Sequence, residues 1–326
     1  MTAGDRNVLC ARVAVLIPCH NEQETVAEVV AAFSQALPEA DVYVYDNRST
    51  DATAERARQA GAVVRREVRL GKGHVVRRMF ADVEAEIYVM VDGDGTYEAA
   101  AARAMVDLLI DDTLDMVVGC RQPVPDQHDV YRPGHAMGNK VFTRALRTVF
   151  GGEFTDVFSG YRVMSRRLVK SFPIQSAGFE IETELNVHAV QLGAACAEVP
   201  TRYGNRDEDS DSKLRTGRDG IRIMMTILRL FRQLRPLQFF GILFVALTLV
   251  ALALGIPVVE AYVDTGLVAR FPTAIMAAAI QTVAFICLTC GLVLENVVGA
   301  RKEARRLAYL QIPRVARPPR GTTFGP

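Results

Sequence analysis

The segment IYVMVDGDGT, residues 87–96, places an apolar run directly before two carboxylates on a glycine-rich turn. Such a run is typical of a buried strand. Carboxylates two positions apart can bind one hard cation, and the glycines let a phosphate approach the backbone closely. In open α/β sheets, ligands bind at the carboxyl ends of the strands. The segment therefore indicates a divalent-metal site for a phosphorylated ligand, with Asp92 and Asp94 as metal ligands; a solvated acidic turn is the alternative.

The sequence around this segment alternates between strand-like and helix-like patterns. Strands are predicted near residues 12–18, 41–45, 62–65, 86–91, 115–119, 160–165 and 195–201. Helices are predicted near residues 24–36, 98–110, 134–150 and 179–191. This alternation with short turns predicts an α/β fold whose mostly parallel sheet is covered by helices on both faces.

Composition restricts the class of partner and the compartment. The formal net charge is +1, so no global field favours nucleic acid. The six cysteines show no zinc-ligand spacing with histidine. The first 12 residues contain no apolar core of a secretory signal peptide, so we expect everything before residue 236 to lie in the cytoplasm.

The last third of the chain contains two long apolar runs, residues 239–259 and 271–294. Each has the length needed to span a bilayer, about 20 residues. Arginines precede the first run and basic residues follow the second, so the positive-inside rule places both flanks in the cytoplasm. A buried hairpin in a soluble protein is the alternative. Before the runs, residues 219–235 combine apolar residues at helical spacing with arginines, which is typical of an interfacial helix; a core-facing helix is the alternative.

These patterns predict four regions. They are a cytoplasmic α/β domain at 1–215, an amphipathic juxtamembrane helix at 216–236, two transmembrane helices within 237–300 (about 239–259 and 272–296), and a basic cytoplasmic tail at 301–326. The predicted location is the cell (inner) membrane, with two passes.

Polar residues follow several predicted strands at the same edge of the sheet. They lie in Pro18–Glu22, Asp46-Asn47, Gly71–Gly73 and Asp92–Asp94. A carboxylate at Asp46 suits a base or ribose, and Lys72 between two glycines suits a diphosphate. The paired aspartates suit the metal that bridges that diphosphate.

Eight motifs in order resemble those of the family 2 glycosyltransferases with the GT-A fold. They are VAVLIPCHNE (13–22), VYDNRSTDAT (44–53), GKGHVVR (71–77), VDGDGTY (91–97), RPGHAMGN (132–139), TDVFSGYRVMSRR (155–167), GFEIETEL (178–185) and SKLRTGRDG (212–220). The later motifs are similar to those of the subgroup that transfers one sugar to a polyprenyl phosphate, such as dolichyl-phosphate mannosyltransferases and bactoprenol glucosyltransferases. The resemblance covers about residues 12–235.

Carried over by position, the resemblance implies three groups of site residues. The donor-binding residues are Pro18, Asn21, Glu22, Asp46, Lys72, Asp92 and Asp94. The residues that bind the acceptor phosphate are Arg121, Arg132, Arg202 and Lys213, since planar guanidinium groups suit bidentate phosphate binding. The catalytic residues are Asp94, Asp156, Arg132 and Arg206. Asp92 and Asp94 hold Mg²⁺ or Mn²⁺. Thr96 stands where some relatives have a metal-contacting glutamine, which puts a third protein ligand in doubt.

The implied reaction is one inverting transfer of a hexose, of mannosyl or glucosyl type, from a UDP- or GDP-sugar to polyprenyl phosphate. A phosphate monoester is largely ionised at neutral pH, because its second pKa is about 6. It can therefore attack without a strong base, and catalysis requires alignment and stabilisation of the departing nucleoside diphosphate. Glu180, Glu182 and Glu184 are candidates for contacts to sugar hydroxyls, although one helix cannot point all three inward. A homo-oligomer is compatible with the sequence.

Other functions are compatible with parts of this pattern. DGDGT also fits the nucleophile motif of haloacid-dehalogenase-like phosphatases, but there it normally follows the first strand of the catalytic domain. A processive membrane polysaccharide synthase would carry a QxxRW motif, and this chain contains no tryptophan. A non-catalytic membrane adaptor with a decayed site is the third alternative.

Overall fold

The computed structural model describes residues 11–123, 154–174, 176, 178, 180–204, 228, 231–268 and 270–315. The chain divides into two compact units. The first comprises Met1–Lys213 with Arg305–Pro326, and the second comprises Leu214–Ala304. The predicted helix at 134–150 and most of the predicted interfacial helix at 219–235 lie outside the described residues.

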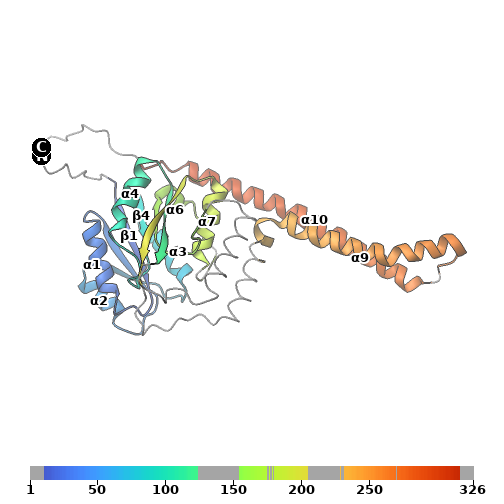
Figure 1. Ribbon diagram of the computed structural model, residues 1–326, viewed down its shortest axis with the longest axis horizontal. Coiled ribbons are helices and arrows are strands. Elements are labelled where there is room, and N and C mark those ends of the chain that lie inside the picture. The colour runs from blue at the N-terminus through green and yellow to red at the C-terminus, as the bar shows by residue number, and fades with distance from the viewer. Residues whose placement is uncertain are drawn as a thin grey trace. The chain divides into compact units, whose positions relative to one another are not determined.

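The first unit contains a seven-stranded sheet in the order β3-β2-β1-β4-β6-β5-β7. Figure 1 shows this sheet together with the helices that pack around it. The strands are β1 (Val13–Cys19), β2 (Asp41–Asp46), β3 (Val63–Arg66), β4 (Ile87–Met90), β5 (Met116–Pro123), β6 (Arg162–Ser165) and β7 (Cys196–Tyr203). Its helices are α1 (Val26–Ala36), α2 (Thr53–Gln59), α3 (Lys72–Asp82), α4 (Ala101–Asp111), α6 (Arg166–Lys170) and α7 (Ile181–Leu192). The predicted α/β class with a mostly parallel sheet is confirmed.

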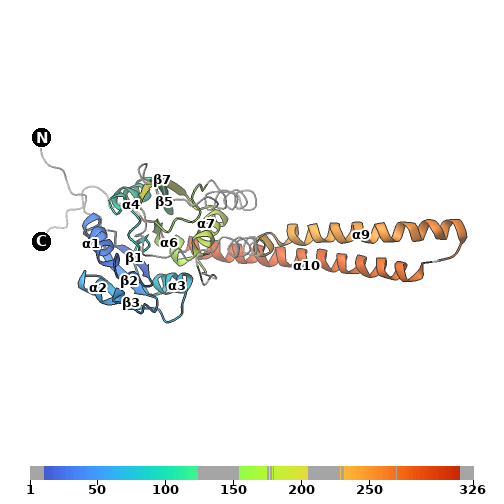
Figure 2. The same cartoon turned by 60° about the horizontal axis from the view of Figure 1, so that its bottom comes forward.

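Helices cover both faces of the sheet (Figure 2). The side chains of the central strands β1 and β4 are apolar and buried on both faces, so each face needs a layer of helices to cover it. Val15 of β1 and Val89 of β4 belong to the core that includes α1 and α4. On the other face, the ring of Tyr88 lies 6.2 Å from that of Phe80 on α3. The central strands are therefore buried on both sides, as their continuous apolar sequence indicates.

One strand, β6, runs against the others and pairs antiparallel with both β4 and β5. Its amino-terminal end therefore lies at the edge where β1, β2, β4, β5 and β7 have their carboxyl ends. The segment that precedes β6, residues 154–161, is brought to the same edge. Sequence periodicity identified this strand but not its direction.

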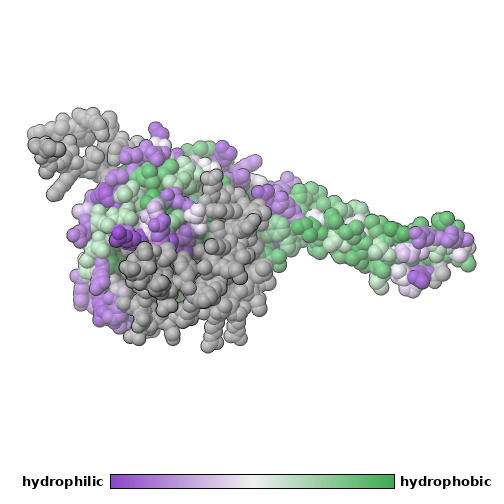
Figure 3. All heavy atoms as spheres, in the orientation of Figure 1, coloured by the Kyte–Doolittle hydropathy of each residue, from purple (hydrophilic) through white to green (hydrophobic). Residues whose placement is uncertain are grey.

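The second unit contains two long apolar helices, α9 (Pro236–Thr265) and α10 (Phe271–Leu310). Both are long and apolar enough to span a membrane. Their surface is largely hydrophobic (Figure 3). Within this unit, Gln281 Nε2 donates to Thr248 Oγ1 at 3.4 Å and the backbone N–H of Leu237 donates to Glu295 at 3.2 Å.

Helix α10 continues to Leu310, beyond the predicted helix end near residue 296 and into the predicted tail. Its last turns belong to the first unit. There Tyr309 donates to Asp115 at 2.7 Å and Arg305 donates to Gln191 at 3.0 Å. Polar anchors at this end explain why the helix does not stop where the apolar run stops.

Candidate active site

The loops after β1 and β2 are joined through their polar side chains. Asn21 accepts a hydrogen bond from the N–H of Thr50 at 2.9 Å, and its own N–H donates to Ser49 Oγ at 3.0 Å. The N–H of Glu22 donates to Thr53 Oγ1 at 2.9 Å. Asn21 has a φ of 56°, a left-handed conformation that asparagine tolerates better than most residues. These contacts fix the first predicted motif against the second.

Asp46 and Asn47 shape the loop that leads to Lys72. Asp46 is buried and accepts from the N–H of Ser49 at 3.0 Å. The amide of Asn47 donates to the Arg69 carbonyl at 2.7 Å and accepts from the N–H of Gly71 at 2.8 Å. The end of β2 therefore positions the start of α3, which begins at Lys72.

Lys72 makes two ion pairs at once. Its Nζ lies 2.5 Å from Asp92 Oδ1 and 2.5 Å from Glu182 Oε1. Burial alone would lower the pKa of Lys72, but the charges of the two carboxylates outweigh burial and raise the pKa above its ordinary value. Lys72 is therefore a protonated cation next to the first aspartate of the DGD turn.

The DGD turn is held from both ends. Gly95 adopts a φ of 72°, which favours glycine, and the Gly93 carbonyl accepts a hydrogen bond from Thr25 at 2.6 Å. Asp94 Oδ1 accepts from both the N–H and the hydroxyl of Thr96, at 3.2 and 2.6 Å. Thr96, which departs from the glutamine of some relatives, thus orients the second aspartate.

Asp92 lies against a glycine of the segment before β6. A Cβ placed on Gly160 would clash with Asp92 Oδ2, so only glycine leaves room for this carboxylate in its present position. The N–H of Gly160 donates to the Tyr97 hydroxyl at 2.9 Å. Neither Gly160 nor Tyr97 was predicted as a site residue; the signal available was a glycine at the start of a predicted strand, which often marks a close approach.

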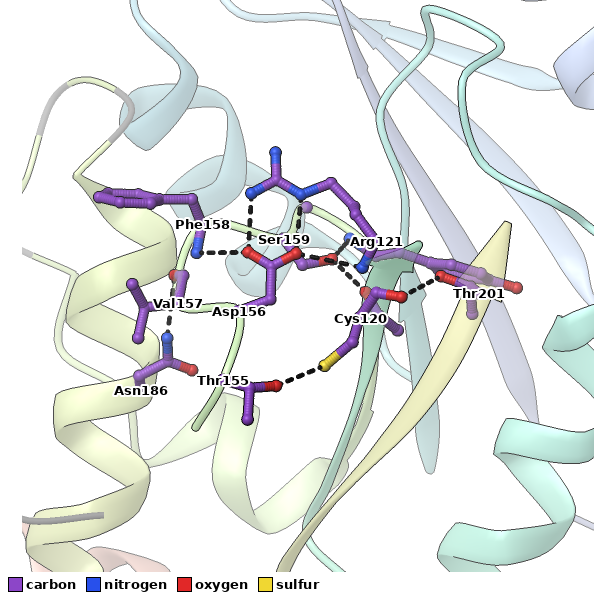
Figure 4. Close-up of polar contacts among 12 residues, drawn as sticks. Cys120, Arg121, Thr155, Asp156, Val157, Phe158, Ser159, Asn186 and Thr201 are labelled. Carbon is purple, nitrogen blue, oxygen red and sulfur yellow. Dashed lines mark hydrogen bonds and ion pairs between the residues drawn. The ribbon is translucent and has the colours of Figure 1, made fainter. Parts of the chain in front are cut away.

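Arg121 and Asp156 form a two-point ion pair at the end of β5 (Figure 4). Arg121 Nε and Nη2 each lie 2.7 Å from an oxygen of the Asp156 carboxylate. The backbone N–H of Arg121 also donates to Asp156, at 3.2 Å. Burial raises the pKa of Asp156, but Arg121 outweighs burial and holds the pKa below its ordinary value. Arg121, predicted to bind the acceptor phosphate, is thus paired with Asp156, which was predicted as a catalytic residue.

A buried arginine supports the segment that carries Asp156. Arg162 has no exposed surface and donates to the carbonyl oxygens of Ser159 and Val157, at 2.9 and 3.3 Å. It also donates to Asn186 on α7 at 2.7 Å. Asn186 in turn donates to the Val157 carbonyl at 2.9 Å (Figure 4). Helix α7 therefore fixes the backbone on which Asp156 and Gly160 stand.

Two tyrosines lie between the DGD turn and Arg121. The rings of Tyr97 and Tyr203 are 5.2 Å apart, and the Arg121 guanidinium lies 5.5 Å from the centre of the Tyr203 ring. Burial raises the pKa of Tyr97, and the Asp92 charge adds to this effect. Tyr97 is therefore a neutral hydroxyl at the site.

The three glutamates on and before α7 have different surroundings. Glu182 is the buried one and pairs with Lys72. Glu184 accepts from the N–H and hydroxyl of Ser176, at 2.9 and 2.7 Å, and Glu180 is exposed. The expectation that the three acids cannot all point inward is confirmed, and Glu182 is the one that points to the predicted donor residues.

All seven predicted donor residues lie at the same edge of the sheet. These are Pro18, Asn21, Glu22, Asp46, Lys72, Asp92 and Asp94, all at or just after the carboxyl ends of β1, β2 and β4 or at the start of α3. Arg202 is exposed on β7, and its backbone N–H donates to Glu98 at 3.4 Å. Arg132, Arg206 and Lys213 lie outside the described residues.

Asp92 and Asp94 fit one established mode of metal binding. Mg²⁺ commonly binds through one or two carboxylates, substrate phosphates and water, and seldom in an all-protein cage. Within the described part of the chain, no three His, Cys, Asp or Glu side chains gather as a metal-binding group. A pair of aspartates completed by a diphosphate agrees with both observations.

Similarity to known proteins is found along most of the chain. The family model for glycosyl transferase family 2 matches residues 14–172. Glycosyltransferase AglJ of Haloferax volcanii is 37% identical over 256 residues, which cover 77% of this chain and 81% of that protein. Undecaprenyl-phosphate mannosyltransferase of Micrococcus luteus is 26% identical over 227 residues, which cover 63% of this chain and 88% of that protein.

Solved structures share the fold. Glucosyl-3-phosphoglycerate synthase from Mycobacterium tuberculosis, in complex with Mn²⁺, uridine diphosphate and phosphoglyceric acid, superposes with a TM-score of 0.54 at 23% identity. The superposition covers 67% of this chain and 78% of that enzyme. Another structure of the same enzyme contains Mg²⁺ and uridine diphosphate.

Proposed function

Because the chain belongs to glycosyl transferase family 2, we propose that it transfers one hexose from a nucleotide sugar to the phosphate of a polyprenyl phosphate at a membrane surface. The product is a polyprenyl-phosphate sugar. The observation that carries this proposal is the position of two charged groups at one sheet edge. They are the DGD turn with Lys72, and the Arg121–Asp156 pair. The first suits a metal-bound diphosphate and the second suits a phosphate monoester.

The donor half of the reaction rests on Asp92, Asp94, Lys72 and Asp46. When bound, a divalent metal would neutralise the diphosphate and stabilise it as a leaving group. Asp92 and Asp94 are the residues that would hold it. Lys72 would supply a further cation for the diphosphate, and the buried Asp46 would accept hydrogen bonds from the nucleoside.

The acceptor half rests on Arg121 and Asp156. The guanidinium fork that now binds two carboxylate oxygens has the same geometry that binds two phosphate oxygens. A phosphate oxygen of the acceptor forms the new bond to the anomeric carbon as the bond from that carbon to the diphosphate breaks. No proton has to be removed from the acceptor, because its phosphate is already ionised. Asp156 then orients the acceptor or the sugar.

The lipid nature of the acceptor is supported by two further observations. The relative from Micrococcus luteus is named for undecaprenyl phosphate. In addition, α9 and α10 are long and apolar enough to cross a membrane. We propose that both helices span the cell membrane and that the flanking basic residues, which include Arg235, Arg301 and Lys302, lie in the cytoplasm.

This topology has a direct test. A membrane-impermeant maleimide should label a Leu267→Cys variant in intact cells, because Leu267 lies between the two helices and is 70% exposed. A cysteine placed at Lys302 should be labelled only after the cells are opened. Labelling of both positions in intact cells, or of Lys302→Cys alone, would contradict the proposed orientation.

The activity is tested with the purified full chain in detergent. Polyprenyl phosphate, Mg²⁺ or Mn²⁺ and a panel of labelled UDP- and GDP-hexoses are supplied, and the lipid product is identified by mass spectrometry. We expect one donor to give a lipid heavier by a single hexose, joined through phosphate. A folded protein that transfers no sugar from any donor would contradict the proposal, as would a lipid that carries many sugars, which is the product of a processive synthase.

A further inference from the structure

Lys72 is a buried cation shared between the DGD turn and α7. Its side chain is 9% exposed, while those of Asp92 and Glu182 are 28% and 5% exposed. Glu182 reaches Lys72 through Oε1 alone, and its Oε2 is buried without a hydrogen-bond partner in the described structure. A buried carboxylate oxygen without a partner is costly. Burial raises the pKa of Glu182, and the charge of Lys72 opposes this rise.

The position of Lys72 conflicts with that of a metal ion. A divalent ion bound to Asp92 lies about 2 Å from a carboxylate oxygen. Lys72 Nζ already lies 2.5 Å from Asp92 Oδ1. An ammonium group and a divalent cation on one carboxylate repel each other strongly, because the interior screens their charges weakly.

A diphosphate resolves this conflict. The negative charge of the diphosphate can pair with the Lys72 ammonium group when that group moves away from Asp92. Displacing Lys72 from Asp92 costs free energy, and whichever of metal and diphosphate binds first bears that cost. The second then binds more tightly, and this coupling must be reciprocal.

We propose that Lys72 is a built-in competitor for the metal at Asp92, and that Glu182 is the positioning residue that holds Lys72 there until a nucleoside diphosphate arrives. This inference rests on the proposed function only in its use of a metal-bound nucleotide donor. The site then binds metal weakly by itself and binds metal and donor together, so that an ion is not trapped in a site without substrate.

The decisive variant is the double substitution Lys72→Met with Glu182→Gln. It removes one positive and one negative charge, so the net charge of the site is unchanged. It also avoids leaving Glu182 buried without its partner. Glu180→Gln is the matched control, because Glu180 is exposed at the start of the same helix.

The measurement is the affinity of the full chain in detergent for Mn²⁺ alone, monitored through the paramagnetic resonance signal of free Mn²⁺. The same titration is then repeated in the presence of UDP or GDP. We expect the double variant to bind Mn²⁺ alone about tenfold more tightly than the unmodified protein, and to show little further gain with nucleotide, as a coupling of typical size predicts. Glu182→Gln alone should change Mn²⁺ binding less than the double variant does, since the charge of Lys72 stays beside Asp92. Glu180→Gln should bind as the unmodified protein does.

Equal or weaker Mn²⁺ binding by the double variant, including no binding by either protein, would overturn the inference. Thermal unfolding of each variant shows whether a change in affinity reflects loss of the fold. No acceptor lipid is present, so this result is independent of whether polyprenyl phosphate is the acceptor. A protein that transfers no sugar to that lipid could still show the competition between Lys72 and Mn²⁺. A protein that does transfer sugar to it could show no such competition.

Discussion

Arg121 and Asp156 join the end of β5 to the segment before β6 through two parallel hydrogen bonds of 2.7 Å. Their side chains are only 18% and 11% exposed, so solvent screens the pair less than it screens a surface ion pair. In the proposed reaction the acceptor phosphate takes the place of the carboxylate and presents two of its oxygens to the same guanidinium. The pair thus holds Arg121 in the orientation that the phosphate needs.

The first prediction concerns the planar fork of Arg121. Arg121→Lys keeps the charge and loses the second parallel hydrogen bond, so we expect the KM for the acceptor to rise about tenfold or more, the effect of losing one charged hydrogen bond. The KM for the nucleotide sugar should change little. Arg103→Lys is the control, since Arg103 pairs with Glu39 on another part of the fold. A rise in the KM for the donor with an unchanged KM for the acceptor would show that Arg121 binds the donor and not the acceptor.

The second prediction concerns Gly160. Gly160→Ala places a Cβ against the Asp92 carboxylate, so this carboxylate must leave its position beside Lys72. We expect turnover at subsaturating metal to fall about tenfold or more, with a stability loss of about 1–3 kcal/mol from overpacking. Gly299→Ala is the control, because a Cβ there would contact nothing within 4 Å. If the turnover of Gly160→Ala depends on metal concentration as that of the unmodified protein does, metal binding does not require Asp92 to lie in its present position.

The third prediction concerns Asp94. Asp94→Asn keeps the acceptor for the two hydrogen bonds from Thr96 and removes the negative charge. We expect turnover to fall by about a hundredfold to a thousandfold, the usual effect of removing one electrostatic group from an active site. The melting temperature should stay close to that of the unmodified protein. If Asp94→Asn turns over normally at every metal concentration, the metal assignment is wrong.

The fourth prediction concerns pH and stability. Burial, together with the nearby charge of Arg305, lowers the pKa of His188 to about 3. In the unfolded chain its pKa is about 6.5, so below that pH the unfolded state takes up a proton that the folded state refuses. Folding free energy is therefore lost as pH falls from about 6.5 towards 3, and the loss from this group reaches about 1.4 kcal/mol one pH unit below 6.5.

His188→Gln tests this origin of the pH dependence. Glutamine does not titrate and can still hydrogen-bond to Ser171, which lies 3.2 Å from the His188 ring nitrogen. We expect the melting temperature of the variant, measured by circular dichroism, to fall less between pH 7 and pH 5.5 than that of the unmodified protein. Identical slopes for both proteins would show that His188 is not the group responsible.

The sequence was sufficient for the sheet and for the position of the DGD turn at its edge. The apolar runs of β1 and β4 are continuous, and each ends in polar residues, so both their burial and the position of the DGD turn could be predicted. Two long apolar runs likewise predicted α9 and α10. The antiparallel direction of β6 was not predictable, because alternation of side chains is the same for either direction of a strand.

The proposed acceptor side rests on contacts between distant segments that the sequence does not show. Arg121 and Asp156 are 35 positions apart, and each was predicted as a site residue without its partner. The same is true of Lys72 and Glu182, since helical spacing shows that the acids of α7 diverge but not which of them is buried. The role of Gly160 depends on the register Met90↔Arg162, which places it beside Asp92 and is set by the packing of the whole sheet.

The central claim is that a lipid-linked phosphate monoester accepts the sugar. The most direct measurement supplies the purified chain and its preferred donor with three acceptors in separate reactions: polyprenyl phosphate, the matching polyprenol without phosphate, and 3-phosphoglycerate. We predict transfer to polyprenyl phosphate alone, with a product in which phosphate links sugar and lipid, and loss of this product in Asp94→Asn. Transfer to 3-phosphoglycerate in preference to the lipid, or to the free polyprenol, would contradict it.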